Sequence, residues 1–278
     1  MKNKFKLNSS TLLVFILTTG VFGIINTEMG VIGILPLIAE NFQVTVPEAG
    51  WTVSIFALVV AISAPITPLL FSGINRKKVM ILALGLFTLS NIISMMTTNF
   101  TALLISRALP AFLHPVYVSM AFTVAAASVS KEKAPKAVAK VFIGVSAGMV
   151  LGVPVTSYIA SEVSYSMGML FFTVVNALVL VATILFVPSM PVKEKLSYGT
   201  QLGVLKKKVV WYSILAITLI NGALFGFFSY MSDYLKTITG VSYTVISTML
   251  LIYGLANIIG NVIAGKQLAV NPVRSMIM

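Results

Sequence analysis

Three ionisable residues lie inside long apolar stretches of this 278-residue chain: Glu28, Arg107 and His114. An ionisable side chain in hydrocarbon costs about 3 kcal/mol unless it is neutral, paired or hydrated, so such residues commonly mark ion or proton pathways. His114 is the only histidine in the chain and follows Arg107 by seven residues, which is two turns along the same face of a helix. An imidazole titrates near neutral pH and can relay protons. We therefore predict that Glu28, Arg107 and His114 form a proton-handling site.

Glu28 and Arg107 are expected at the same depth. Glu28 lies about 7 residues before the outer end of its segment and Arg107 about 6 residues after the outer start of its own, which places both roughly 10 Å deep at 1.5 Å per residue. If they pair, Arg107 keeps Glu28 charged; if they lie apart, desolvation favours a neutral Glu28 that carries a proton. We hypothesise an ion pair between them that opens and closes, and the sequence leaves both outcomes open.

Eight apolar segments separated by short polar loops position these residues. Each is close to the roughly 20 residues that cross about 30 Å of hydrocarbon. The segments are residues 11–35, 50–72, 79–97, 102–127, 138–160, 167–187, 209–232 and 243–264. The prediction is an all-α membrane protein with eight transmembrane helices.

Lysine and arginine residues are concentrated in alternate loops, which predicts the orientation. One side holds the basic residues of the N-terminus, of loops two, four and six, and of the C-terminal segment, whereas the other side holds Lys236 alone. Because translocation of Lys and Arg is disfavoured, we expect both termini to be cytoplasmic in a cell or inner membrane. The first segment is longer than the apolar region of a signal peptide and is expected to stay attached. The net charge of +12 follows from this topology and does not indicate nucleic-acid binding.

Composition excludes several other classes. Hydrophobic residues make up 58% of the chain and charged residues only 9%, which is outside the range of soluble domains. The chain contains no cysteine, a single histidine and no catalytic signature such as HExxH or GxSxG. We therefore expect no cofactor, no metal site and no enzyme activity.

The segment 188–208 separates the sixth predicted span from the seventh and is interpreted as a cytoplasmic linker. It is rich in charge and contains Pro188, Pro191 and Gly199, which break a continuous helix. We expect an N-terminal six-helix bundle over residues 1–187 and a partial C-terminal bundle over residues 209–278. Similar basic turns follow the second and eighth spans about 197 residues apart, so two complete repeats would need about 394 residues. The sequence thus resembles one whole half and two spans of a second, truncated after the eighth.

Polar and small residues within the spans have two expected roles. Gly144, Gly148 and Gly152 recur every four residues before Pro154, a stripe that lets two helices pack closely. Asn26 and Asn221 are polar positions that could bind a substrate, although hydrogen bonds between helices are the more common use of such residues.

Several of these residues together resemble a known family. They are Thr27-Glu28-Met29 with Gly33 to Pro36, the loop residues Arg76, Lys77 and Lys78, then Arg107, His114 and the Gly144 to Pro154 stripe. The pattern resembles the major facilitator superfamily, and within it the drug:proton antiporters similar to bacterial arabinose-efflux and purine-efflux permeases. The resemblance implies a helical bundle of two pseudo-symmetric halves with a central cavity. It also implies a signature loop at Arg76 to Lys78, proton coupling at Glu28 and Arg107, and an antiporter motif at the glycine stripe.

The chain departs from the family pattern at several positions. Ser72 replaces the acidic residue of the signature loop, Pro68 and Asn75 replace its glycines, Pro115 follows the histidine in place of glycine, and Met149 replaces the antiporter-motif proline. A charge relay through the loop is therefore not expected to operate in its usual form.

The resemblance implies a proton-coupled efflux permease for a small organic solute or drug. Its partners would be that solute, protons and the lipid bilayer; the sequence does not predict an oligomeric state. Two alternatives stay open: a truncated fragment that does not transport, and a membrane channel, sensor or assembly protein.

Overall fold

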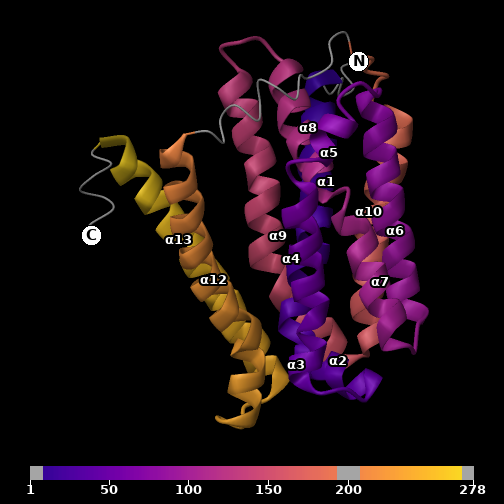
Figure 1. Ribbon diagram of the computed structural model, residues 1–278, viewed down its shortest axis with the longest axis vertical. Helices are drawn as coiled ribbons and strands as arrows, with labels where there is room; N and C mark the ends of the chain where they lie inside the picture. Colours follow the sequence, from indigo (N-terminus) through magenta and orange to yellow (C-terminus); the bar gives the residue numbers. More distant parts are fainter. Residues whose placement is uncertain (1–8, 193–206, 271–278) are drawn as a thin grey trace, which may run out of the picture.

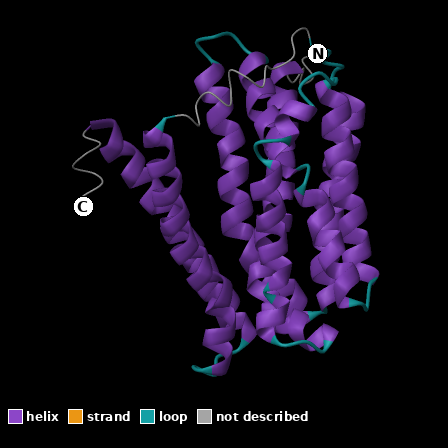
Figure 2. Cartoon of the chain, viewed as in Figure 1, coloured by secondary structure: helices purple, strands orange, loops and turns teal. Residues whose placement is uncertain are grey.

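The computed structural model describes residues 9–192 and 207–270, and within these ranges the chain consists of helices joined by turns and loops (Figure 2). The basic N-terminal residues, most of the predicted linker and the last eight residues lie outside the described ranges.

The helices follow one another in the order expected of membrane spans. They are α1 (Ser9–Met29), the 3-10 helix η1 (Gly30–Ile34), α2 (Leu35–Phe42), α3 (Val46–Ala49), α4 (Trp51–Ser63), α5 (Thr67–Leu70), α6 (Arg76–Met96), α7 (Phe100–Ala111), α8 (His114–Ala127), α9 (Ala134–Glu162), α10 (Tyr165–Phe186), α12 (Lys208–Thr237) and α13 (Tyr243–Val270).

Seven helical stretches in the described ranges are long and apolar enough to cross a membrane. The eighth predicted span corresponds to α13, whose apolar portion in the described ranges is Tyr243–Ala256. The predicted segments therefore match the helices in order, but two of their ends differ substantially. The second span was expected to end at residue 72, but α4 ends at Ser63 and the short α5 is a separate helix. The first span was expected to end at residue 35, but the helical stretch continues through α2 to Phe42. Pro36 lies in the first turn of α2, where a missing N–H costs little, so it restarts the helix rather than ending it.

Prolines interrupt three of the spans. Pro36 offers no N–H to the carbonyl four residues before it, and the chain runs as 3-10 helix over Gly30–Ile34. Pro65 follows the end of α4, and Pro115 follows the break between α7 and α8. The break at Pro115 makes His114 the first residue of α8 instead of an interior residue of one long helix. It corrects the expectation that Arg107 and His114 share a continuous helix face.

The first six spans form one bundle, and the hairpin of α12 and α13 lies along one side of it (Figure 1). The two parts meet at the end of the bundle where α12 turns into α13 and diverge toward the other end. A small apolar core joins them, formed by Ile32 of η1, Val153 of α9, and Ile246 and Leu250 of α13. Close to it, the Thr244 hydroxyl donates a 2.9 Å hydrogen bond to the Glu162 carboxylate.

Hydrogen bonds join the start of α6 to the end of α10 and to the chain that follows it. The Asn75 amide donates to the Ser189 hydroxyl at 2.7 Å, and its oxygen accepts from the N–H groups of Lys77 at 3.1 Å and Met190 at 3.3 Å. The Arg76 N–H donates to the Met190 carbonyl at 3.1 Å, and the Lys77 ammonium donates to the Ile184 carbonyl at 2.8 Å. Asn75 thus caps α6 and binds the beginning of the predicted linker. The glycine that the family pattern has at this position carries no side-chain amide and could not make these contacts.

Candidate functional site

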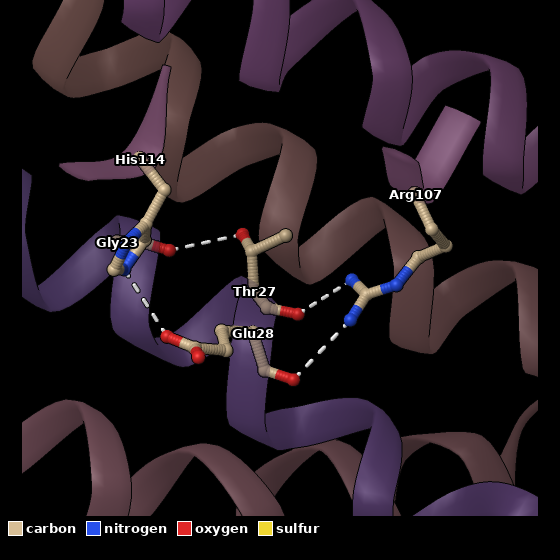
Figure 3. A network of polar contacts seen from close by, with 5 residues as sticks. All are labelled: Gly23, Thr27, Glu28, Arg107 and His114. Atoms are coloured by element: carbon tan, nitrogen blue, oxygen red, sulfur yellow. Dashed lines mark hydrogen bonds and ion pairs between the residues drawn. The ribbon is translucent and has the colours of Figure 1, made fainter. Parts of the chain in front are cut away.

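The Glu28 carboxylate, near the end of α1, lies against the imidazole of His114 at the start of α8. Glu28 Oε2 and His114 Nε2 are 3.1 Å apart, and the two side chains are 18% and 11% exposed (Figure 3). The distance is that of an ion pair, but neither imidazole nitrogen makes a hydrogen bond within the described residues. The attraction therefore depends on whether the imidazole carries its second proton.

Arg107 is almost completely buried and binds main-chain oxygen atoms. Its guanidinium donates to the carbonyls of Thr27 at 2.8 Å and Glu28 at 3.3 Å, and its Nε donates to the Thr52 carbonyl at 3.3 Å (Figure 3). Glu28 and Arg107 therefore lie close together, since the guanidinium contacts the main chain of Glu28. The expected Glu28–Arg107 carboxylate pair is not formed in this conformation, because the Glu28 side chain turns to His114 while its carbonyl turns to Arg107.

The change of helix type at the end of α1 explains why the Thr27 and Glu28 carbonyls are available to Arg107. The α-helix ends at Met29 and continues as 3-10 helix from Gly30. Where the helix type changes, the regular i to i−4 ladder is interrupted and carbonyls can accept from another donor. The main chain of α1 thus provides Arg107 with acceptors in place of a carboxylate, and Glu28 keeps its side chain for a second partner.

Phe56 of α4 lies between the two basic groups. The Arg107 guanidinium carbon lies 4.9 Å from the centre of the Phe56 ring, a cation–π contact. The same ring makes an edge contact with His114, with ring centres 5.8 Å apart. Phe56 is 1% exposed. A single buried aromatic side chain therefore contacts two groups that can both be positively charged.

Asn26 and Asn221, the other predicted cavity residues, do not join this cluster. Asn26 is buried where α1 meets α9, and its amide makes no hydrogen bond to any described residue. Asn221 is exposed on α12, and its amide donates to the Ile217 carbonyl of its own helix at 2.9 Å. The rotation of each helix decides where its amide points. The Asn26 side chain lies against α9, and the Asn221 side chain is exposed on α12.

The glycine stripe is a packing surface between α9 and α1. A Cβ atom on Gly144 would lie 2.2 Å from the Thr18 carbonyl oxygen, and one on Gly148 would lie 2.9 Å from Ile25. On Gly152 it would lie 2.8 Å from the Asn26 side-chain oxygen. The three glycines therefore leave room for α9 to pack closely on α1 along the stretch that ends at Glu28.

A small cavity of about 70 Å³ lies next to the site, between the six-span bundle and α12–α13. Its lining is almost entirely apolar and comes from four spans: Met29, Ser146, Met149, Val150, Val153, Pro154, Leu224, Phe225, Phe228, Leu250, Tyr253 and Gly254. Met29 connects the cavity to the ionisable cluster because it directly follows Glu28 in α1. Among the described residues, no group of three metal-binding side chains lies close together.

Sequence patterns did not point to Phe56, and they indicated Thr27 only as part of the family resemblance. Phe56 is one of many aromatic residues in apolar spans, and no local signal distinguishes it. Thr27 is only 1% exposed, and its hydroxyl and carbonyl both bind other helices. The resemblance gave Thr27 no role of its own, because it does not say which helices the side chain contacts.

Replacing Arg107 with lysine is expected to destabilise the folded protein by about 2–4 kcal/mol. A lysine ammonium is a point charge on a flexible stem and cannot reproduce the planar fork that reaches three carbonyls, which would leave buried acceptors unpaired. Thermal unfolding in a mild detergent measures the effect. Arg76→Lys is the matched control, because the hydrogen bond that Arg76 donates within the described residues comes from its main-chain N–H. Equal losses in both variants would contradict the carbonyl-binding role.

Comparison with known proteins places the chain in a family. The model of the Major Facilitator Superfamily matches residues 12–277. The chain is 30% identical over 250 residues to the inner membrane transport protein YdhP of Escherichia coli K12, and 27% identical over 250 residues to that organism's putative transporter AraJ. Each match covers 90% of this chain and 64% of the relative, so the chain spans a little under two thirds of their length.

Solved structures show the same architecture. A bacterial homologue of the human lysosomal transporter Spinster, in an inward-facing and unoccupied conformation, superposes with a TM-score of 0.69 at 17% identity. The match covers 90% of this chain and 60% of that one. Because the family model matches nearly its whole length, the chain belongs to the Major Facilitator Superfamily.

Proposed function

We propose that this protein takes part in exporting a small organic solute across the membrane in exchange for protons. The observation that carries the proposal is the contact of Glu28 with His114 beside the buried Arg107. The carboxylate of Glu28 contacts one basic group and its main-chain carbonyl binds another, at a helix break in a part of the chain that is long and apolar enough to span the membrane. Such a group can change its protonation and its partner during a transport cycle.

The proton step follows from charge balance. When His114 is protonated, Glu28 pairs with it and Arg107 is satisfied by carbonyls. When His114 loses its proton, the remaining cation near the Glu28 carboxylate is Arg107, and the carboxylate is drawn toward it. A proton taken up by Glu28 releases both partners. Three arrangements of one side chain are thereby linked to protonation.

The solute step uses the neighbouring cavity. Met29 lines the cavity and is joined to Glu28 by one peptide bond, so a change in the end of α1 alters both. The apolar lining and the stacked rings of Phe228 and Tyr253, with centres 5.0 Å apart, favour a solute with an apolar or aromatic face. The export direction is inferred from the resemblance of the Gly144 to Pro154 stripe to antiporter motifs.

Proton flux in liposomes tests the proposal. The purified chain is reconstituted with a pH-sensitive dye inside, and a lipophilic aromatic cation, a neutral purine nucleoside and a pentose are added in separate experiments. We expect at least one solute to drive proton movement that empty liposomes lack. A chain that binds or moves a solute without any proton movement contradicts the proton coupling, and no response to any solute contradicts transport of these classes.

A further inference from the structure

Thr27 connects four helices at the level of Glu28. Its hydroxyl donates to the Gly23 carbonyl at 2.9 Å and accepts from the Asn176 amide of α10 at 2.8 Å and from the Asn91 amide of α6 at 3.3 Å. Its carbonyl accepts from Arg107 of α7 at 2.8 Å. Thr27 is 1% exposed, Asn176 is 0% exposed and Asn91 is 3% exposed. All of these bonds are therefore made away from water.

The hydroxyl and the carbonyl of Thr27 have different partners, and this separation suggests a specific role. The hydroxyl holds α1 against α6 and α10 through Asn91 and Asn176. The carbonyl holds the Arg107 guanidinium (Figure 3). The anchor lies just before the change from α-helix to 3-10 helix at Gly30, where the backbone has lost part of its regular ladder. Without the anchor, this part of α1 could turn and move its carbonyls away from Arg107.

A buried guanidinium that loses its two carbonyl acceptors on α1 keeps only the Thr52 carbonyl of α4 and needs another partner. The closest acidic candidate is Glu28, because the Glu28 carbonyl already accepts from Arg107 at 3.3 Å. A charge-assisted bond to the carboxylate is about twice as strong as one between neutral groups. Arg107 would then draw the Glu28 carboxylate away from His114.

We infer that Thr27 is a positioning residue: its hydroxyl, held by Asn91 and Asn176, keeps Arg107 on backbone carbonyls so that Glu28 stays available to His114. The inference rests on the proposed function, because it assigns the residue that keeps the two basic partners of Glu28 apart. It also accounts for a buried threonine that receives two asparagine amides from two other helices.

The single histidine of the chain provides a direct test that needs no substrate. The full chain, carrying a tag without histidine, is labelled with ¹⁵N-histidine and placed in lipid nanodiscs, and the imidazole nitrogen signals of His114 are recorded at one fixed pH. Glu28→Gln serves as the reference for a broken pair. We expect Thr27→Val to move the His114 signals through the larger part of the shift that Glu28→Gln causes, whereas Thr27→Ser keeps the wild-type signals.

Thr183→Val is the matched control. Thr183 is a buried threonine of α10 whose hydroxyl has no hydrogen-bond partner among the described residues, so its loss should leave the His114 signals unchanged. If Thr27→Val does not give a monodisperse protein, Asn176→Ala removes the donor of the 2.8 Å bond and is expected to shift the signals in the same direction.

The outcomes separate the two claims. If Glu28→Gln moves the His114 signals but Thr27→Val and Asn176→Ala leave them at the wild-type position, the positioning role is wrong and the Glu28–His114 pair stands. If Glu28→Gln itself has no effect on His114, the pair does not exist and the proposed proton site is wrong. A shift of the His114 signals in Thr27→Val, together with wild-type signals in Thr27→Ser, supports the inference.

Discussion

Replacing Glu28 with glutamine is expected to abolish solute-driven proton movement while leaving the bundle folded. Glutamine keeps the shape and size of the side chain, but its amide is uncharged. It therefore cannot carry a proton near neutral pH, and it offers no negative charge to His114 or Arg107. Loss of a group that transfers protons typically lowers a rate by about 100-fold or more, and we expect an effect of at least that size. The liposome assay with the internal pH dye measures it.

The folded state should tolerate the change because neither neighbouring basic group depends on the Glu28 carboxylate. His114 can lose its second proton and become neutral, and Arg107 remains on the carbonyls of Thr27, Glu28 and Thr52. We therefore expect the unfolding temperature of Glu28→Gln to stay close to that of the wild type. An activity lost together with the fold would indicate a structural role for Glu28 instead.

Glu40→Gln is the control for this prediction. Glu40 belongs to the same helical stretch, in α2, but it is exposed, so neutralising it changes the chain's charge equally without touching the site. Solute-driven proton movement should be unchanged in Glu40→Gln. If Glu28→Gln retains wild-type proton movement, the carboxylate does not carry the proton and the proposed mechanism is wrong.

Adding one methyl group at Gly144 is expected to destabilise the protein by about 3 kcal/mol, at the upper end of overpacking effects. The new Cβ would lie 2.2 Å from the Thr18 carbonyl oxygen and 3.1 Å from its carbon. Both are main-chain atoms of α1, so no side-chain rotation relieves the clash, and the two helices must separate. Thermal or denaturant unfolding in detergent measures the effect.

Gly85→Ala is the same substitution without the clash. Gly85 lies within α6, and a Cβ atom there would meet nothing within 4 Å. Alanine in a helix interior is more favourable than glycine by about 0.5–1 kcal/mol, so this variant should be slightly more stable than the wild type. Stability changes of the same sign and size at the two positions would show that α9 does not pack on α1 through Gly144.

Much of the fold could be predicted because the relevant physics is local. A stretch of about 20 apolar residues is long enough to span the bilayer whatever its neighbours are. The seven-residue spacing of Arg107 and His114 predicted one continuous helix face, whereas the helix is interrupted just before His114. The longer first span was missed because Pro36 could equally have ended the helix.

Amino-acid types and their positions were enough to identify the residues that are costly in a membrane: Glu28, Arg107 and His114. This conclusion follows from side-chain chemistry and from the length of the apolar segments, which are properties of short stretches of chain. The partners of these residues could be read only from the packed helices: Glu28 turns to His114, Arg107 binds carbonyls, and Asn26 and Asn221 face elsewhere. These choices depend on how α1, α4, α7 and α8 are rotated and shifted against one another. A shift of one residue rotates a helical side chain by about 100°, so partner choice is a property of the packed bundle.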